Sequence, residues 1–248
     1  MAYIELKSAT LDLPIYDVQA RSLKKQVLRM GRRNAIAEGN DGVVVVRALD
    51  NVDLRFETGD RIGLIGHNGA GKSTLLRTMA GIYTPTYGTI ESEGKIVPLL
   101  DISLGMDENS TGLQNIRLRG LLLGMSDAEI REKQQSIADF CELGDYLDLP
   151  LRTYSSGMRV RLGFAISTAV DAEILLLDEV MGVGDASFMH KAEERLADLH
   201  SRAEIVVLAM HSNAEIRKVC NKVLWMERGR VRAFGPTEEV VSEYEALV

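Results

Sequence analysis

The sequence predicts an α/β fold built on a mostly parallel sheet. Three observations lead to this class. The N-terminal third of the chain contains segments of strand character, the middle is helical, and strands return in the last third with helical stretches between them. Strands that alternate with helices are typical of a parallel sheet covered on both faces, because each parallel connection needs a crossover long enough for a helix.

The predicted strands are short apolar runs or segments of alternating polarity. In chain order they are residues 43–46, 52–56, 61–65, 174–177, 205–209 and 223–226. A helical pattern begins at about Leu75, and residues 111–170 are expected to be mostly helical. Within them, Ser126 and Glu129 have the spacing of a capping box, followed by apolar residues at helical spacing. No linker rich in Pro, Gly or Ser flanks this insert, so we expect a subdomain rather than a separate domain.

Composition excludes several classes of protein. The chain has 248 residues, of which 46% are hydrophobic and 26% charged, which excludes a disordered or collagen-like chain. No apolar stretch approaches the ~20 residues that a membrane-spanning helix needs. Cys141 and Cys220 form no C-x-x-C pair, so a disulfide framework is not expected. The formal net charge of −7 argues against general affinity for nucleic acid.

A glycine-rich segment after the third predicted strand matches G-x-x-x-x-G-K-[ST] in full, with a helical run directly behind it. This context is that of a P-loop, whose backbone N–H groups surround a phosphate at a helix N-terminus. Lys72 would reach the β- and γ-phosphates, and the Ser73 hydroxyl would bind Mg²⁺. The predicted phosphate-binding residues are Gly66, His67, Asn68, Gly69, Ala70, Gly71, Lys72, Ser73 and Thr74. The alternative, a glycine-rich turn without a ligand, is disfavoured because strand, loop, Lys-Ser pair and helix are all in register.

Two carboxylates follow the buried strand 174–177, at the end of a strand where open α/β sheets bind ligands. Asp178 can hold Mg²⁺, and Glu179 can orient and deprotonate an attacking water. A core strand followed by a solvated acidic turn would look the same by itself. Beside a complete P-loop, the pair predicts a nucleotide hydrolase.

A third motif, Tyr154-Ser155-Ser156-Gly157-Met158-Arg159, precedes an apolar helical stretch. Its hydroxyls could simply cap that helix, or the helix start could be a second anion site. Here the chain resembles the ATP-binding cassette (ABC) ATPases, whose signature has the form LSGGQ. The segment keeps Ser155 and Gly157 but has Tyr154, Ser156 and Met158 where the pattern has Leu, Gly and Gln.

The resemblance implies a single ABC nucleotide-binding domain over residues 1–248. It would be a P-loop NTPase with a mostly parallel core sheet, an antiparallel β portion and a helical subdomain at about 107–170. It also implies a homodimer with two Mg·ATP, in which Ser155, Ser156 and Gly157 of one copy contact the ATP of the other.

The same resemblance implies roles for four further residues. His211 would contact the γ-phosphate and Asp185 would end the D-loop. Tyr16 would stack on adenine, although a tyrosine at a strand end is as often core filler. Asp107 stands nearest the place of the family's glutamine, where it could bind Mg²⁺.

Three segments, residues 110–115, 153–158 and 179–185, look like those of the ATPase subunits of bacterial polysaccharide exporters. Such subunits serve O-antigen, capsule or teichoic acid export. The resemblance implies a membrane permease partner, expected in two copies, and an indirect interaction with a lipid-linked polysaccharide. It implies no nucleic-acid partner. It would place the chain on the cytoplasmic side of the bacterial inner membrane. The alternatives are a soluble ABC ATPase acting on nucleic acid or ribosomes, and the ATPase of another transporter.

A basic insertion at about 19–34 agrees with that branch. Residues 20–33 hold six basic and no acidic residues, and Leu23, Val27 and Met30 form one helical stripe. Such a helix could lie at an anionic membrane surface or meet the lipid-linked substrate. A solvated helix that packs its stripe on the domain is the alternative.

Overall fold

The computed structural model describes residues 1–15, 36–38, 44–100, 102, 105–178, 186–210 and 212–247. It divides into two compact units, Met1–Gly94 with Val207–Val248, and Lys95–Val206. The second unit contains the helical segment expected at about 107–170 and extends beyond it on both sides. The basic insertion at about 19–34 lies outside the described residues. Among the described helices, none combines the length and the apolar character needed to cross a bilayer.

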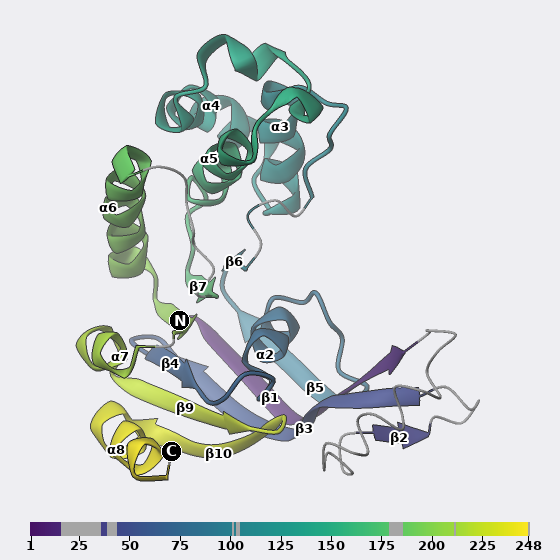
Figure 1. The fold of residues 1–248 in the computed structure, drawn as a ribbon, viewed down its shortest axis with the longest axis vertical. Coiled ribbons are helices and arrows are strands. Elements are labelled where there is room, and N and C mark those ends of the chain that lie inside the picture. The colour runs from purple at the N-terminus through teal and green to yellow at the C-terminus, as the bar shows by residue number, and fades with distance from the viewer. Residues whose placement is uncertain are drawn as a thin grey trace. The chain divides into compact units, whose positions relative to one another are not determined.

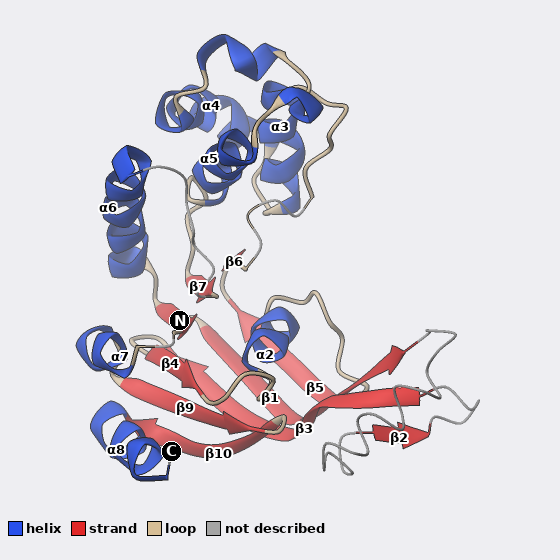
Figure 2. Cartoon of the chain, viewed as in Figure 1, coloured by secondary structure: helices blue, strands red, loops and turns tan. Residues whose placement is uncertain are grey.

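The first unit is mostly strand (Figures 1 and 2). Its strands are β1 (Tyr3–Ile15), β2 (Ile36–Glu38), β3 (Val44–Glu57), β4 (Arg61–Ile65), β5 (Tyr87–Glu93), β9 (Lys222–Glu227) and β10 (Arg230–Pro236). Its helices are α2 (Lys72–Met79), α7 (Asn213–Val219) and α8 (Thr237–Leu247). An antiparallel sheet has the order β2-β3-β1-β5. In the second sheet, β4 pairs parallel to β9, and β9 pairs antiparallel to β10. The parallel pair and the antiparallel β portion confirm the expected mixture.

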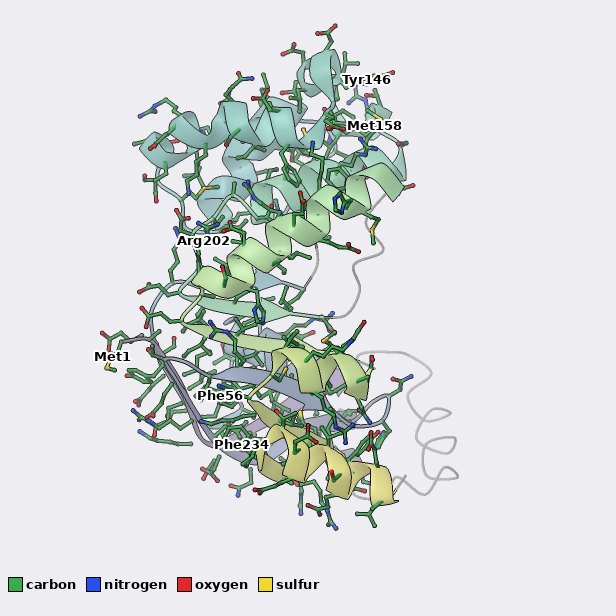
Figure 3. All side chains as sticks on the ribbon, turned by 90° about the vertical axis from the view of Figure 1, so that its left-hand side faces the viewer. Met1, Phe56, Tyr146, Met158, Arg202 and Phe234 are labelled. Carbon is green, nitrogen blue, oxygen red and sulfur yellow. The ribbon has the colours of Figure 1, made fainter. Side chains whose placement is uncertain are left out.

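Strand β3 begins at Val44, within the predicted run 43–46, and continues through the separately predicted run 52–56. Residue 43 lies outside the described residues. Asn51, between the two runs, has a φ of 51°, and the pairing of β1 with β3 shifts register on both sides of this point. The strand therefore continues through a bulge. Beyond it the predicted alternation is confirmed, because Val52, Leu54 and Phe56 are buried while the residues between them are exposed. The Phe56 ring packs against that of Phe234 on β10, with centroids 5.6 Å apart (Figure 3).

Helix α2 begins at Lys72, three residues before the position where the sequence pattern becomes helical. The first turn, Lys72-Ser73-Thr74, is polar and half-buried, so it carries no apolar periodicity. Apolar burial starts at Leu75 and Leu76, which are fully buried. The polar first turn is the part of the helix that the phosphate-binding motif requires, which explains the difference.

The second unit is mostly helix (Figure 2). Its elements are β6 (Ile96–Leu99), α3 (Gly112–Leu122), α4 (Asp127–Cys141), the 3₁₀ turns η1 (Gly144–Asp148) and η2 (Leu151–Thr153), α5 (Ser156–Ser167), β7 (Ile174–Leu177) and α6 (Ala186–Arg202). Strands β6 and β7 pair in parallel, from Ile96 beside Ile174 to Leu99 beside Leu177. Strand β8 (Ile205–Ala209) carries the chain from this unit back into the first.

The helices of the second unit are held by caps and an aromatic core. Ser126 and Glu129 form the predicted capping box of α4, with the Glu129 carboxylate 2.6 Å from the Ser126 N–H. Phe140, Phe164 and Phe188 bring α4, α5 and α6 together, with ring centroids 5.5–6.0 Å apart. Helix α5, which carries the third motif, is therefore firmly packed on its inner side.

Candidate functional site

The loop between β4 and α2 has the backbone geometry of a phosphate cradle. Gly66, Gly69 and Gly71 have φ values of 135°, 76° and 109°, in the left-handed region that favours glycine. A Cβ on Gly66 would overlap the Met226 carbonyl oxygen, so steric exclusion also requires glycine at the first position of the motif. The strand, loop and helix context that the sequence predicts is confirmed.

The N-terminus of α2 differs from those of α3, α4, α5 and α7. Helices α3, α4, α5 and α7 are each capped by a hydroxyl side chain, from Thr111, Ser126, Ser155 and Ser212 respectively. Helix α2 has Gly71 at its N-cap position, with no side-chain cap and no acidic residue in its first turn. The positive end of the helix dipole and its first N–H groups are therefore directed to a loop that can surround an anion.

Lys72 brings a positive charge over this loop. Its Nζ donates to the Gly66 carbonyl at 2.5 Å and to the His67 carbonyl at 3.3 Å. Within the loop, the Ala70 N–H donates to the same His67 carbonyl at 3.0 Å. His67, Asn68 and Gly69 are exposed at the rim. A phosphate chain placed on the loop would thus meet a fixed ammonium group and an uncapped helix start.

Asp178, the first carboxylate of the acidic motif, lies in the second unit. Ile174, Leu175 and Leu176 of β7 are fully buried, and Asp178 follows the strand half-buried. Its position at the carboxyl end of a parallel strand agrees with the predicted role in binding Mg²⁺. Within the described part of the chain, no cluster of three or more His, Cys, Asp or Glu side chains is arranged to hold a metal ion.

Four predicted site residues, Tyr16, Glu179, Asp185 and His211, lie outside the described residues. Their roles stay predictions from the resemblance.

The third motif forms the start of α5. Ser155 is the N-cap, and its Oγ accepts the Met158 N–H at 3.3 Å. Ser155 and Ser156 are exposed, and Gly157 is half-buried without a neighbour near the place of a Cβ other than Ser155 Oγ at 4.0 Å. The capping interpretation is therefore confirmed for Ser155. It is compatible with the second interpretation, because an exposed, glycine-containing helix start can also receive an anion from outside.

The departure from the family pattern at Tyr154 has a structural reason. Its ring is buried, its hydroxyl donates to the Tyr146 carbonyl at 2.5 Å, and burial raises the pKa of Tyr154 to about 12. The hydroxyl lies against Gly112, where a Cβ would overlap it. Tyr154 thus ties the segment before the Ser155 cap to η1, and its hydroxyl requires glycine at position 112, the start of α3.

This contact predicts a specific coupling in stability. Tyr154→Phe is expected to lower the free energy of unfolding by about 0.5–1.5 kcal/mol, the usual contribution of one hydrogen bond. Gly112→Ala is expected to cost more in the wild type than in the Tyr154→Phe background, where no hydroxyl opposes the new methyl group. Denaturant unfolding of the two single variants and the double variant measures this coupling. Tyr146→Phe, which keeps the accepting carbonyl, is the matched control, and strictly additive effects would contradict the contact.

The structure places Asp107 in a closed turn before α3. Its carboxylate accepts the Ser110 hydroxyl at 2.5 Å and the Asn109 N–H at 3.1 Å, and these bonds, the Ser110 bond first, hold the pKa of Asp107 below its usual value. The fully buried Asn115 side chain accepts the Asp107 N–H at 2.8 Å and donates to the Asp107 carbonyl at 2.9 Å. Asp107 therefore orders its own turn, and its predicted role in binding Mg²⁺ stays a prediction.

Sequence reasoning missed a link between this turn and the third motif. The Arg159 guanidinium donates to the Glu108 carboxylate at 2.7 Å, and the Arg152 N–H donates to the Glu108 carbonyl at 2.9 Å. No spacing rule joins positions 108 and 159, so only the folded chain reveals the pair. Through Glu108, the turn at 107–110 is consequently attached both to η2 and to the start of α5.

Comparison with known proteins agrees with this geometry. Residues 49–182, more than half of the chain, match the family model described as ABC transporter. The chain is 46% identical over 231 residues to the O-antigen export system ATP-binding protein RfbE of Yersinia enterocolitica, covering 93% of this chain and 97% of that protein. It is 38% identical over 201 residues to the teichoic acids export ATP-binding protein TagH of Lactococcus lactis, of which it spans 43%.

Among solved structures, one similar chain is an ATP-binding cassette described as dimeric, in a post-hydrolysis state with ADP and Pi bound. The TM-score is 0.66 at 19% identity, over 94% of this chain and 98% of that one. This likeness supports the fold. With the family match and the phosphate-binding loop, it leads to one conclusion: the chain belongs to the ABC transporter family and is one of its ATP-binding, ATP-hydrolysing cassettes.

Proposed function

We propose that this chain is the ATP-hydrolysing subunit of an exporter that moves a lipid-linked polysaccharide of the O-antigen, capsule or teichoic acid type across the cytoplasmic membrane. The observation that carries the proposal is the similarity to RfbE along nearly the full length of both chains, combined with an intact phosphate-binding loop. The names of RfbE and TagH describe ATP-binding proteins of O-antigen export and of teichoic acids export.

The residues present fit Mg·ATP. The left-handed glycines and the uncapped start of α2 suit the phosphates, and Lys72 would balance the charge of the β- and γ-phosphates. Ser73 and Asp178 offer a hydroxyl and a carboxylate, the hard oxygen ligands that Mg²⁺ prefers. Bound Mg²⁺ would supply neutralisation of the charge that develops on the phosphates. Glu179 would accept a proton from the attacking water, and His211 would contact the γ-phosphate.

We propose that two copies of the chain act together. Ser155, Ser156 and Gly157 of one copy would complete the phosphate site of the other, with Asp185 beside it, and Tyr16 would stack on the adenine. Ser155 and Ser156 are exposed at the start of α5, which supports this arrangement, because the helix start is open to an incoming ligand. Hydrolysis would remove the γ-phosphate contact and loosen the pair, since a ligand shifts an equilibrium only by its different affinity for the two states.

The remaining partner would be a membrane permease, in two copies, so that the chain would lie on the cytoplasmic side of the inner membrane. The export-system names of the relatives support this assignment. The link from the turn at 107–110 to the start of α5 offers a route by which permease contact could reach the nucleotide. The polysaccharide would be met indirectly, through the permease.

The proposal predicts loss of surface polysaccharide when the chain is removed from its host. Surface glycan, measured by gel and immunoblot, should disappear in a deletion strain while lipid-linked glycan accumulates inside the cell. Wild-type chain should restore export, and a Lys72→Met variant should not. Unchanged surface glycan in the deletion strain contradicts the proposal. Co-purification with ribosomes or nucleic acid in place of a permease would favour a soluble ABC ATPase that acts on them.

The same assay tests the basic insertion. Reversing the charges of Lys24, Lys25 and Arg29 is expected to reduce export while leaving ATP hydrolysis by the isolated chain unchanged, if this segment meets anionic lipid. Equal export by the variant and the wild type would favour a solvated segment.

A further inference from the structure

The turn between β9 and β10 reaches the phosphate-binding loop from a distant part of the sequence. Its two central residues, Arg228 and Gly229, have φ values of 52° and 78°. Two successive left-handed residues are the mark of a type I′ hairpin turn, which Gly at the second position suits. The turn is therefore tight and well defined, and it brings Gly229 close to the loop.

Gly229 is hydrogen-bonded on both sides. Its N–H donates to the carbonyl of Ala70, inside the phosphate-binding loop, at 2.8 Å. Its carbonyl accepts the N–H of Asp50, on β3, at 2.9 Å. The turn thus lies between the loop and the antiparallel sheet and connects them through one residue.

The space around this contact leaves no room for a side chain. A Cβ on Gly229 would lie 2.6 Å from the Ala48 carbonyl oxygen, well inside van der Waals contact. On the other side, a Cβ on Gly71 would lie 3.1 Å from the same oxygen and 3.3 Å from the Gly229 Cα. Both segments therefore have glycine where they approach each other, Gly71 in the loop and Gly229 in the turn.

An ion pair holds the same turn to β3. Arg230 Nη2 lies 2.5 Å from the Asp50 carboxylate, and its Nε donates to the same oxygen at 2.7 Å. The Arg230 side chain is 70% exposed, so this pair contributes little stability. The backbone bonds of Gly229 are therefore the main hydrogen bonds that hold the hairpin beside the loop.

The bond to Ala70 has a consequence for the phosphate site. A peptide unit is planar and trans, so its N–H points opposite to its C=O. When Gly229 holds the Ala70 carbonyl, the N–H of Gly71 in the same peptide unit is directed away from the hairpin. That N–H stands at the uncapped start of α2, where the helix offers donors to an anion.

We infer that the Arg228–Gly229 turn is a positioning element for the phosphate-binding loop, and that Gly229 is its key residue. The inference rests on the proposed binding of ATP. Gly229 fixes the peptide unit between Ala70 and Gly71, so that the loop is already arranged for phosphate before the nucleotide arrives. Pre-arranged donors bind charge more strongly than donors that must reorient. No motif marks this turn in the sequence.

Gly229→Ala tests the inference, with Gly81→Ala as the matched control. Gly81 has a φ of 72° and no atom within 4 Å of the place of a Cβ, so both alanines meet similar backbone strain but only one meets an obstacle. Gly229→Ala is expected to raise the Kd for Mg·ATP and Mg·ADP by about tenfold or more, equivalent to about 1.4 kcal/mol. Gly81→Ala should keep the wild-type Kd even though its melting temperature falls. A folded Gly229→Ala variant with wild-type affinity would overturn the inference.

Hydrogen exchange of the wild-type chain gives an answer that does not depend on the variant folding. ADP binding is expected to slow exchange of the Gly229 amide by about tenfold, because the nucleotide stabilises the loop whose carbonyl this amide binds. Unchanged exchange at Gly229, when ADP is bound, would also overturn the inference. Failure of the wild-type chain to bind either nucleotide would instead contradict the proposed function, so the two results are distinguishable.

Discussion

Replacing Lys72 with methionine is expected to lower kcat/KM for ATP hydrolysis by about 10²-fold or more, because one positioned donor for developing charge contributes about that much. The Lys72 ammonium lies over the phosphate-binding loop, with its Nζ 2.5 Å from the Gly66 carbonyl. A phosphate chain on the loop would find this charge in place. Methionine keeps most of the length and the apolar stem of the side chain but supplies neither charge nor donor.

The loss of nucleotide affinity should be larger for ATP than for ADP, since Lys72 contacts the β- and γ-phosphates. Hydrolysis is measured by phosphate release and affinity by nucleotide titration, with thermal unfolding to show that the variant is folded. Lys72→Arg is the matched control for charge. It should restore little activity, because a planar guanidinium does not replace a compact ammonium in so small a loop. Hydrolysis by Lys72→Met within about threefold of the wild type would contradict the assigned role.

Replacing Glu179 with glutamine is expected to lower kcat by about 10²- to 10⁴-fold while ATP affinity is retained. Glutamine has the shape of glutamate and can still hydrogen-bond a water molecule, but it cannot accept a proton at neutral pH. Because ATP would then persist in the site, the variant should accumulate as a closed dimer. Size-exclusion chromatography and light scattering with Mg·ATP measure this population.

Glu173→Gln is the matched control for that experiment. Glu173 lies at the other end of β7, exposed, where its carboxylate accepts the Lys95 N–H at 2.7 Å. A glutamine can accept the same bond, so near-normal hydrolysis is expected. Near-normal turnover by Glu179→Gln would refute its role as the base. A Glu179→Gln variant that stays monomeric with Mg·ATP at high concentration would refute the paired arrangement.

Local sequence patterns predicted much of the fold because they reflect interactions between residues that are close along the chain. Alternation over 52–56 predicted a half-buried strand, and the Ser126 and Glu129 spacing predicted a capped helix. Both are confirmed, since each depends on neighbours along the chain. Strand β5 had no such signal. Nearly all of its residues are exposed, and its pairing with β1 supplies the order that its composition does not.

The sequence alone determined the α/β class, the phosphate-binding loop, the acidic strand end and the family, because each of these depends on motifs of residues that are close together in the chain. Only the tertiary structure decided why Tyr154 needs Gly112, why Glu108 meets Arg159, and why Gly229 lies against the phosphate-binding loop. These contacts join residues that are 42 to 159 positions apart. They depend on excluded volume and hydrogen-bond direction, which no spacing rule along the chain encodes.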